Sequence, residues 1–338
     1  MPSVSVLMPC FNAAVTLGEA LDSLAEQTMD DFEVVAVDDG SGDETLGILE
    51  NRAARDKRFR VIAQNHAGII AALNTGLVAC RAPYIARMDS DDRSHPRRLE
   101  LQADYLDKNT DTALVSCLVS GFPQDQVREG FRLYMEWQNS LVDDSDIRRE
   151  IFIESPFAHP SVMVRKDWMD RVGGYQEKGW AEDYDLWLRL FLAGARFGKV
   201  SQHLLDWREY PERLTRSDSR YSLENFLRAK AYYLVKGPLI GRDAVIIWGA
   251  GMMGKRLSKH LIKHGCPLVA FIDIDPRKIG RTRRGRPVLH PQELLACWKR
   301  YENPVLLAAV GARGARSLIK GQLSEQGLQE GEDWWSVA

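Results

Sequence analysis

The chain has 338 residues, of which 45% are hydrophobic and 27% charged, and its formal net charge at pH 7 is −2. This composition excludes a disordered chain, and the length suits two domains better than one core. The longest uncharged apolar run, Ala244–Gly254, is too short for a membrane span, which takes about 20 residues, and we expect no secretion signal. The five cysteines form no C-x-x-C pair, so we expect reduced thiols, no structural zinc site and a cytoplasmic location.

Charge is unevenly distributed along the chain. From Arg242 onward there are 16 Lys and Arg residues against 9 Asp and Glu residues, whereas the rest of the chain has 29 against 38. An acidic first part suits a bound divalent cation. A basic second part could face phosphates, a membrane surface or only solvent.

Short apolar runs alternate with helical patterns over the first hundred residues. Four runs have the pattern of strands: Val4–Met8, Phe32–Val37, Arg60–Ala63 and Tyr84–Met88. Three segments between them have helical spacing: Leu17–Gln27, Thr45–Asp56 and Ile69–Ala79. This order predicts an α/β fold with a mostly parallel sheet that is covered by helices on both faces. In such a sheet, ligands bind beyond the carboxyl ends of the strands.

The rest of the chain suggests a second, smaller α/β region. Residues 110–210 are less regular, and a helical pattern over Tyr221–Val235 then leads to the sequence Lys-Gly-Pro at 236–238, which is typical of a boundary. A new strand pattern begins at Ala244–Trp248. We therefore predict two domains, residues 1–236 and 237–338.

An acidic cluster, Asp89–Asp92 (D-S-D-D), follows the fourth predicted strand. Three carboxylates in four residues repel one another unless solvent or a cation neutralises them. Magnesium or manganese is typically held by one or two carboxylates together with substrate phosphates. The alternative is an acidic turn in which Asp92 caps the following helix.

The second predicted strand is followed by Asp38–Asp43 (D-D-G-S-G-D), which is a turn by composition. A carboxylate there could accept hydrogen bonds from a nucleotide base or a ribose, and the glycines would let the backbone approach a ligand. Phe11, after the first strand, offers a flat face on which a base could stack. Each feature alone is ambiguous, but all three motifs lie at strand ends and predict one site.

The order of these motifs resembles that of the family 2 glycosyltransferases, which have the GT-A fold. The similarity lies in five segments: Val4–Ala13, Leu21–Thr28, Phe32–Asp43, residues 68–76 and Arg87–Asp92. It covers about residues 1–230. The resemblance implies an inverting transfer of a sugar from a nucleoside-diphosphate sugar, with UDP as the favoured carrier and Mn²⁺ or Mg²⁺ as the metal.

The resemblance also implies roles for individual residues. It places Phe11 and Asp39 at the nucleotide base, Asp89 near the ribose, and Asp91 at the metal, where Asp92 could share the role. By the same resemblance, we expect four further residues to bind substrate: Pro9, Asn12, Gly68 and Asn74.

A second acidic segment, Trp180–Leu190, resembles the E-D segment that holds the family's catalytic base. At about 100° per residue, a helix here would place Asp183 on the apolar face and Asp185 towards solvent, with Glu182 between them. An inward carboxylate at a helix start can remove the proton of an acceptor hydroxyl. We predict Asp183 as the base and Glu182 as a substrate-binding neighbour; the alternative is that Asp183 only caps its helix.

Two other residues are candidates for the substrate cleft. His159 precedes a strand-like run in a segment that lines the cleft in similar proteins, so it could contact a phosphate or the acceptor, or be structural. Trp180 could stack on an acceptor sugar, or belong to the core.

The C-terminal region contains a G-x-G-x-x-G pattern formed by Gly249, Gly251 and Gly254. It follows a strand pattern, opens a helical pattern and precedes Asp273 at the end of another strand, which is the context of a dinucleotide-binding fingerprint. The region is similar to the small Rossmann-like domains attached to bacterial sugar-modifying enzymes. Nucleotide binding, a structural or oligomerising role and a second activity are all open, and a basic loop (Arg281, Arg283, Arg284 and Arg286) could reach phosphate or be solvated.

The favoured function is a sugar transferase in the assembly of a bacterial surface polysaccharide or glycan. We expect a nucleotide-sugar donor, a glycan or lipid-linked acceptor, and no nucleic acid. Peripheral contact with the inner face of the membrane and a homo-oligomer remain open. One alternative is an NAD(P)-dependent oxidoreductase that uses the C-terminal domain. The other is a non-catalytic nucleotide-sugar-binding scaffold.

Overall fold

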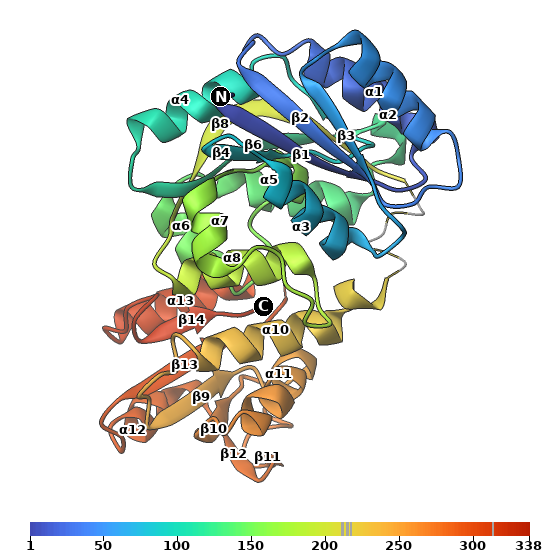
Figure 1. Ribbon diagram of the computed structural model, residues 1–338. Helices are drawn as coiled ribbons and strands as arrows, with labels where there is room; N and C mark the ends of the chain where they lie inside the picture. The colour runs from blue at the N-terminus through green and yellow to red at the C-terminus, as the bar shows by residue number, and fades with distance from the viewer. Residues whose placement is uncertain (211–212, 214–215, 217, 313) are drawn as a thin grey trace. The chain divides into compact units, whose positions relative to one another are not determined.

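The structure is a computed structural model that describes residues 1–210, 213, 216, 218–312 and 314–338 (Figure 1). The chain forms two compact units, and each consists of several chain segments. The first unit comprises Met1–Ile147, Pro156–Lys178 and Glu182–Ser217. The second comprises Arg148–Ser155, Gly179–Ala181 and Asp218–Ala338.

The first unit is built on an eight-stranded sheet with the order β3-β2-β1-β4-β7-β6-β8-β5. The strands β1 to β4 pair in parallel, as do β6 and β8, whereas β7 and β5 run antiparallel to their neighbours. The strands are β1 (Val4–Cys10), β2 (Phe32–Asp38), β3 (Phe59–Ala63), β4 (Tyr84–Arg87), β5 (Arg93–Ser94), β6 (Thr112–Phe122), β7 (Met163–Arg165) and β8 (Arg196–Arg208). The carboxyl ends of β1, β2, β4 and β8 therefore share one edge of the sheet.

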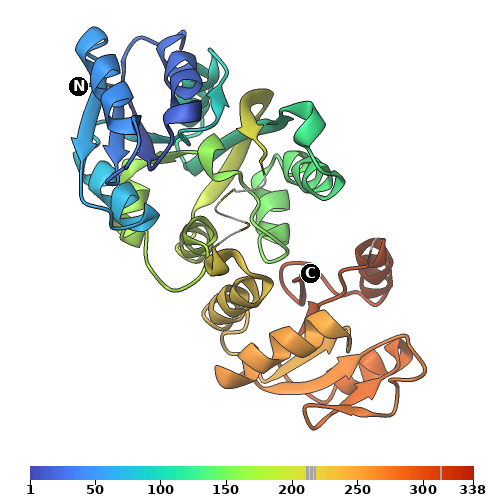
Figure 2. The same cartoon turned by 90° about the vertical axis from the view of Figure 1, so that its right-hand side faces the viewer.

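Helices cover both faces of this sheet (Figures 1 and 2). Every residue of β1 and β2 is buried, as expected of parallel strands between two helical layers. Met8 shares a core with Leu17 on one face, whereas Leu7 on the other face lies against α3 at Gly76. The helices are α1 (Ala14–Ala25), α2 (Thr45–Arg55), α3 (Ile69–Ala79), α4 (Arg98–Lys108), α5 (Glu129–Ser140), α6 (Asp144–Glu150), α7 (Lys166–Val172) and α8 (Glu182–Leu192), with short 3₁₀ turns at Gln124–Gln126 and His159–Ser161.

The second unit has a six-stranded sheet with the order β11-β12-β10-β9-β13-β14. All pairs are parallel except the β11–β12 hairpin. The chain first adds strands on one side of β9 and then on the other, so the order reverses at β9, where open parallel sheets have their ligand crevice. The strands are β9 (Ala244–Trp248), β10 (Leu268–Ile272), β11 (Thr282–Arg283), β12 (Arg286–Leu289), β13 (Pro304–Ala308) and β14 (Trp334–Ser336). The helices are α10 (Leu223–Val235), α11 (Met252–Lys263), α12 (Leu294–Trp298) and α13 (Ala315–Glu325), with 3₁₀ turns at Ser219–Tyr221 and Pro291–Glu293.

Two short segments from earlier in the chain complete the core of the second unit. The ring of Phe152 meets that of Trp335 edge to face, with centroids 5.7 Å apart. The buried ammonium of Lys230 on α10 donates hydrogen bonds to the carbonyl oxygens of Ile153 (2.5 Å) and Val337 (3.3 Å). The helix α10 therefore packs as part of this unit.

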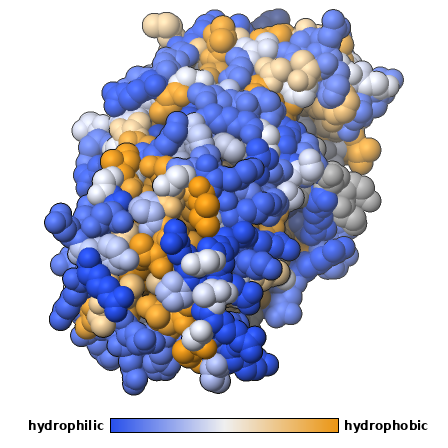
Figure 3. All heavy atoms as spheres, turned by 90° about the horizontal axis from the view of Figure 1, so that it is seen from below, coloured by the Kyte–Doolittle hydropathy of each residue, from blue (hydrophilic) through white to orange (hydrophobic). Residues whose placement is uncertain are grey.

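The expected fold class is confirmed: an α/β chain with a large, mostly parallel sheet and a second, smaller sheet. The four predicted strands are present as β1 to β4, with ends within two residues of the prediction. The functional division at residue 236 stays a prediction. Within the described residues, no helix is both long and apolar enough to cross a membrane. Hydrophilic side chains predominate in the view of Figure 3, with a band of hydrophobic residues between them.

Candidate active site

The loops after β1 and β2 are joined by hydrogen bonds at the carboxyl edge of the first sheet. The backbone N–H of Asn12 donates to the hydroxyl of Ser41 (2.9 Å), and its side-chain oxygen accepts from the N–H of Gly42 (2.8 Å). Asn12 has a positive φ of 50°, which its short polar side chain tolerates. Asn12, predicted to bind substrate, thus fixes the two loops against each other, and Pro9, predicted likewise, is buried within β1.

Asp39, the predicted base-binding residue, is 3% exposed and organises the segment 64–68. Its Oδ1 accepts from the side chain of Gln64 (2.6 Å) and the N–H of Ala67 (3.0 Å). Its Oδ2 accepts from the N–H of Gly68 (2.9 Å) and lies 2.9 Å from Nδ1 of His66. Both carboxylate oxygens therefore have protein partners, and Gly68 is positioned by Asp39.

Phe11 is 47% exposed and stacks on the ring of His66, with centroids 4.2 Å apart and an interplanar angle of 27°. Gly40 makes this approach possible, because a Cβ at position 40 would lie 2.7 Å from the backbone nitrogen of His66. The pair forms an aromatic surface beside the predicted base site. The sequence analysis identified Phe11 but missed His66.

The three carboxylates of the acidic cluster after β4 lie close together. Asp89, Asp91 and Asp92 each offer an oxygen, and these oxygens lie within 4.8 Å of one another. Asp89 also pairs with the buried guanidinium of Arg87, and Oδ2 of Asp91 accepts a hydrogen bond from the hydroxyl of Tyr210 (2.9 Å). Oδ2 of Asp92 is buried without a hydrogen-bond partner among the described residues.

The electrostatics of the cluster suit a bound cation. Burial and then the charge of Asp89 raise the pKa of Asp91, and burial followed by the charges of Asp91 and Asp89 raises the pKa of Asp92 well above its usual value. These shifts reflect a site in which negative charge is not compensated. Oxygen ligands with an unpartnered buried oxygen fit Mg²⁺ or Mn²⁺, and Asp91 and Asp92 are the residues that would hold it.

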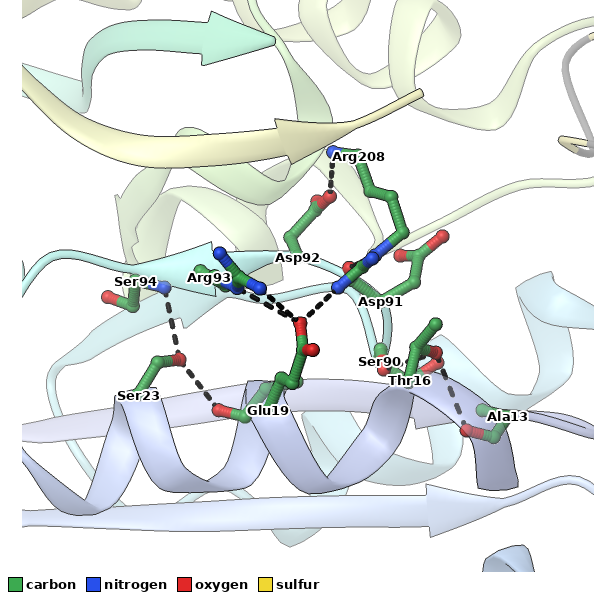
Figure 4. Close-up of polar contacts among 11 residues, drawn as sticks. Ala13, Thr16, Glu19, Ser23, Ser90, Asp91, Asp92, Arg93, Ser94 and Arg208 are labelled. Atoms are coloured by element: carbon green, nitrogen blue, oxygen red, sulfur yellow. Dashed lines mark hydrogen bonds and ion pairs between the residues drawn. The ribbon is translucent and has the colours of Figure 1, made fainter. Parts of the chain in front are cut away.

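Arg208, at the end of β8, fixes the cluster in place (Figure 4). Its backbone N–H donates to Oδ1 of Asp92 (2.7 Å) and its Nε to the carbonyl oxygen of Asp91 (2.5 Å). Its terminal nitrogen pairs with Glu19 on α1, which Arg93 also contacts at 2.7 Å. The acidic loop is therefore tied to both α1 and β8.

The predicted base segment begins α8 at Glu182. Asp183 is half-buried, and Glu182 is 2% exposed. The prediction that Asp185 points to solvent was wrong. Asp185 is fully buried and pairs with Arg189 (2.7 Å) and Lys178 (3.6 Å), because these cations approach it from the next turn and from the preceding loop.

Tyr175 links Asp183 electrostatically to the acidic cluster. Burial raises the pKa of its hydroxyl, the charges of Glu182 and Asp183 raise it further, and Arg87 lowers it. Arg87 in turn interacts with Asp89. The charges of Asp183 and Asp89 therefore act on two neighbouring buried side chains, Tyr175 and Arg87 respectively.

Two further candidates for substrate binding, Asn74 and His159, hold Tyr175 in place. Asn74 uses both ends of its side-chain amide on the backbone of Tyr175, accepting from the N–H (3.0 Å) and donating to the carbonyl (2.9 Å). Nε2 of His159 lies 2.8 Å from the Tyr175 hydroxyl. His159 is 7% exposed, and burial lowers its pKa well below the usual value, so it is neutral at pH 7. These contacts favour positioning roles for Asn74 and His159.

With this geometry established, sequence comparison identifies the family. The model of glycosyl transferase family 2 matches residues 5–173. The chain belongs to glycosyl transferase family 2.

This glycosyltransferase is similar to several known proteins. It is 32% identical over 210 residues to UDP-Gal:alpha-D-GlcNAc-diphosphoundecaprenol beta-1,3-galactosyltransferase of Escherichia coli. The aligned region covers 61% of this chain and 74% of that protein. The crystal structure of S. aureus TarS 1-349 in complex with UDP-GlcNAc has a TM-score of 0.57 at 21% identity, covering 78% of this chain and 72% of that one. Mannosyltransferase PcManGT from Pyrobaculum calidifontis, solved with GDP-Man and Mn²⁺, has a TM-score of 0.51 at 20% identity, covering 69% and 62%. The two structures share the fold of the family 2 enzyme.

Some residues of the glycosyltransferase site were missed in the sequence. Arg208 ends β8 and Tyr210 follows it, at the same edge as the other motifs, but β8 lies in the irregular region and its end carries no recognisable motif. The rule that ligands bind beyond strand ends would have found them had β8 been predicted.

Trp180 and the glycine loop lie in the second unit of the glycosyltransferase. Trp180 is 7% exposed and packs against Tyr232, with centroids 5.6 Å apart, which favours a core role over stacking on a sugar. The glycine loop does connect β9 to α11 as predicted. A Cβ at Gly254 would lie 1.9 Å from the carbonyl oxygen of Gly249, so the helix can pack on the loop only with glycine there.

Proposed function

We propose that this glycosyltransferase moves a sugar, with inversion, from a nucleoside-diphosphate sugar to an acceptor hydroxyl with the help of Mn²⁺ or Mg²⁺. UDP is the proposed carrier. The acceptor is proposed to be a glycan or a lipid-linked sugar in bacterial surface polysaccharide assembly on the cytoplasmic side. The observation that carries the proposal is the convergence of the Asp89, Asp91 and Asp92 carboxylates at the edge where the β1 and β2 loops also meet.

In the proposed reaction, Phe11 and His66 offer the aromatic surface for the base, and Asp39 shapes the adjoining segment. Asp91 and Asp92 would hold the metal, which when bound offsets the charge that develops on the departing diphosphate. Asp183 would accept the proton of the acceptor hydroxyl as that oxygen attacks the anomeric carbon from the opposite side. Asn74 and His159 would hold Tyr175 in place within the site.

The test is sugar transfer and donor hydrolysis by the full chain with UDP-sugars and Mn²⁺. We expect Asp183→Asn to keep donor binding and to lose transfer by a factor of about 10² to 10⁴, which is the usual contribution of a general base. We expect Asp91→Asn to lose metal-dependent donor binding as well. Asp167→Asn is the matched control, because Asp167 is an exposed carboxylate in the first turn of α7. Unchanged turnover in Asp183→Asn would remove Asp183 as the base.

We also propose that residues 237–338 form a Rossmann-like module and residues 1–236 contain the transferase domain, with the compact unit around the module also including α10 and two short segments of residues 1–236. The strand order around β9 and the glycine loop between β9 and α11 support this assignment. Of the alternatives, an NAD-dependent oxidoreductase would need Asp273 to hold a ribose. That carboxylate instead accepts a hydrogen bond from Ala250 and pairs with Lys278.

A further inference from the structure

Two basic cavities adjoin each other at the carboxyl edge of the second sheet. The glycine-loop pocket has a volume of about 520 Å³ and is lined by Glu224, Ala250, Gly251, Met252, Lys255, Arg256, Lys259, Arg283 and Arg284. The hairpin pocket has a volume of about 500 Å³ and is lined by Asp275, Arg277, Lys278, Arg281, Thr282, Arg283 and Val288. Arg283 belongs to both. Cations therefore outnumber carboxylates in each lining.

Much of this positive charge is not compensated by the protein. Lys259 pairs with Glu224, and Arg277 pairs with Asp275. Within the part of the chain that the structure describes, five other lining residues have no carboxylate partner: Lys255, Arg256, Arg281, Arg283 and Arg284. Uncompensated cations around a concave surface attract anions and repel one another when no anion is present.

The glycine loop adds backbone donors to the first pocket. Among the described residues, no side chain caps the first turn of α11, so the N–H groups at its start remain available to an anion. A Cβ at Gly251 would lie 4.0 Å from Nζ of Lys278, so this ammonium extends over the loop. The pocket lining thus combines the start of α11 with the cationic side chains of Lys255 and Arg256, which suits a diphosphate, whereas the ammonium of Lys278 is already paired with Asp273.

Asp273 cannot serve as a free ribose acceptor here. It is 7% exposed, and its Oδ2 accepts from the N–H of Ala250 (2.9 Å) and from Nζ of Lys278 (3.0 Å). Its Oδ1 accepts from the N–H of Asp275 (2.9 Å). Beyond it, where a dinucleotide would extend its ribose, the hairpin pocket offers cations. Open parallel sheets of this kind use arginine at that place for a ribose phosphate.

The β11–β12 hairpin is held over α11 by Arg284. This residue has a positive φ of 49°, and its guanidinium donates to the carbonyl of Lys255 (2.8 Å) and the hydroxyl of Ser258 (3.0 Å). The contact holds Arg283, the preceding residue, at the junction of the two pockets. The basic loop, in which Arg281 and Arg284 are exposed, therefore lines a concave surface.

We propose that the second unit binds a soluble compound with two separate phosphate groups: a diphosphate in the glycine-loop pocket and a further phosphate in the hairpin pocket. This is the chemistry of a phosphorylated dinucleotide. The proposal concerns binding alone and does not depend on the transfer reaction of the first unit.

The first test measures binding of inorganic pyrophosphate to the full chain by titration calorimetry. The background variant is Asp91→Asn in EDTA, so that the first unit cannot take up a metal-bound phosphate. We expect saturable binding that weakens about tenfold or more in Lys255→Glu and in Arg283→Glu, since each removes a charge-assisted contact. The matched control is Lys263→Glu, an exposed lysine of the same helix outside both pockets, which should bind as the background variant does. Absence of saturable binding, or an equal loss in the control, would overturn the proposal.

The second test compares NADP⁺ with NAD⁺ as probes on the same background. We expect NADP⁺ to bind more tightly, and Arg281→Glu to remove that preference while leaving pyrophosphate binding within about twofold. Equal binding of the two probes would overturn the hairpin pocket as a phosphate site. Sedimentation with phosphatidylglycerol vesicles separates the remaining source of phosphate. If the chain binds the vesicles and pyrophosphate does not compete, the ligand is a membrane surface and the proposal of a soluble compound fails.

Discussion

At the scale of single residues, Arg208 shows how a side chain outside the acidic motif controls it. Its Nε donates to the carbonyl of Asp91, and its terminal nitrogen pairs with Glu19 (Figure 4). Neither contact is to the candidate metal oxygens themselves. The contacts decide where the loop backbone lies, and therefore where those oxygens point.

We predict that Arg208→Ala weakens Mn²⁺ binding about 10- to 100-fold, as loss of residues that orient metal ligands does. The concentration of Mn²⁺ that gives half-maximal transfer measures this, and saturating metal should restore most of the rate. Arg196→Ala is the control, because Arg196 begins the same strand and pairs with Asp111 and Asp144 at the surface. Equal metal dependence in the two variants would contradict the assignment.

Lys199 on β8 is 3% exposed, and its ammonium donates to the carbonyl of Gln138 and lies 5.5 Å from the ring of Phe157. Burial lowers its pKa from 10.5 to about 7. As the pH rises, Lys199 therefore loses its proton at a lower pH in the folded state than in the unfolded chain. Stability should rise with pH between about 7 and 10.5, and the cost of the buried charge is fully present below about pH 7.

We predict that Lys199→Met removes this pH dependence. Denaturant unfolding of both proteins, with the metal absent, should show that the stability of the variant relative to the wild type is highest near and below about pH 7 and declines towards about pH 10. A constant difference across that range would mean that the folded-state pKa of Lys199 is not lowered.

At the scale of elements, the packing of α11 against the glycine loop is possible only with glycine at position 254. A Cβ at Gly254 would meet the carbonyl oxygen of Gly249 at 1.9 Å, and backbone cannot move aside as a flexible side chain can. Gly321, in the middle of α13, has nothing within 4 Å of the same position.

We predict opposite effects of the same substitution at these two glycines. Gly254→Ala should lower the free energy of unfolding of the second unit by about 1–3 kcal/mol or more, because α11 must shift from β9. Gly321→Ala should raise it by roughly 0.5–1 kcal/mol through helix propensity. Denaturant titrations of both variants measure the pair. Similar changes in the free energy of unfolding for Gly254→Ala and Gly321→Ala would mean that α11 does not pack on the loop as closely as described.

The sequence predicted elements well where local pattern and burial agree, and poorly where distant partners decide. The strands β1 and β2 are fully buried and largely apolar, and the polar motifs at the ends of β1, β2 and β4 had to meet at one edge of a parallel sheet. Asp185 was misplaced because helix angle alone cannot show that Arg189 and Lys178 neutralise a buried carboxylate. Asp39 was predicted from a motif, but its ties to Gln64 and Gly68 depend on a loop that the motif does not contain.

At the scale of the whole molecule, each compact unit is built from segments that are not consecutive in the sequence. The segments Arg148–Ser155 and Gly179–Ala181 lie in the sequence between parts of the first unit, but they belong to the second unit. A unit assembled this way cannot complete its core from Asp218–Ala338 alone. Its stability should therefore depend on the rest of the chain.

Lys230 makes this dependence measurable. In the full chain its buried ammonium donates to Ile153 and Val337, and the nearby charge of Glu154 raises its pKa against the larger lowering by burial. A fragment that begins at Asp218 lacks Ile153 and Glu154. In this fragment the Lys230 ammonium keeps only the carbonyl of Val337 as an acceptor and no longer has the charge of Glu154 nearby. A buried cation that loses such partners destabilises the fold that holds it.

We predict that Lys230→Met lowers the free energy of unfolding of the second unit by about 1–3 kcal/mol in the full chain, because two buried carbonyls lose their donor. The fragment of residues 218–338 should be less stable than the same unit in the full chain. In this fragment, Lys230→Met should lower the free energy of unfolding by a smaller amount, or raise it. Guanidinium unfolding of the four proteins gives the coupling between Lys230 and the missing segments as a double-mutant cycle. If the fragment were as stable as the intact unit and the substitution had the same effect in both, the segment Arg148–Ser155 would contribute nothing to that core.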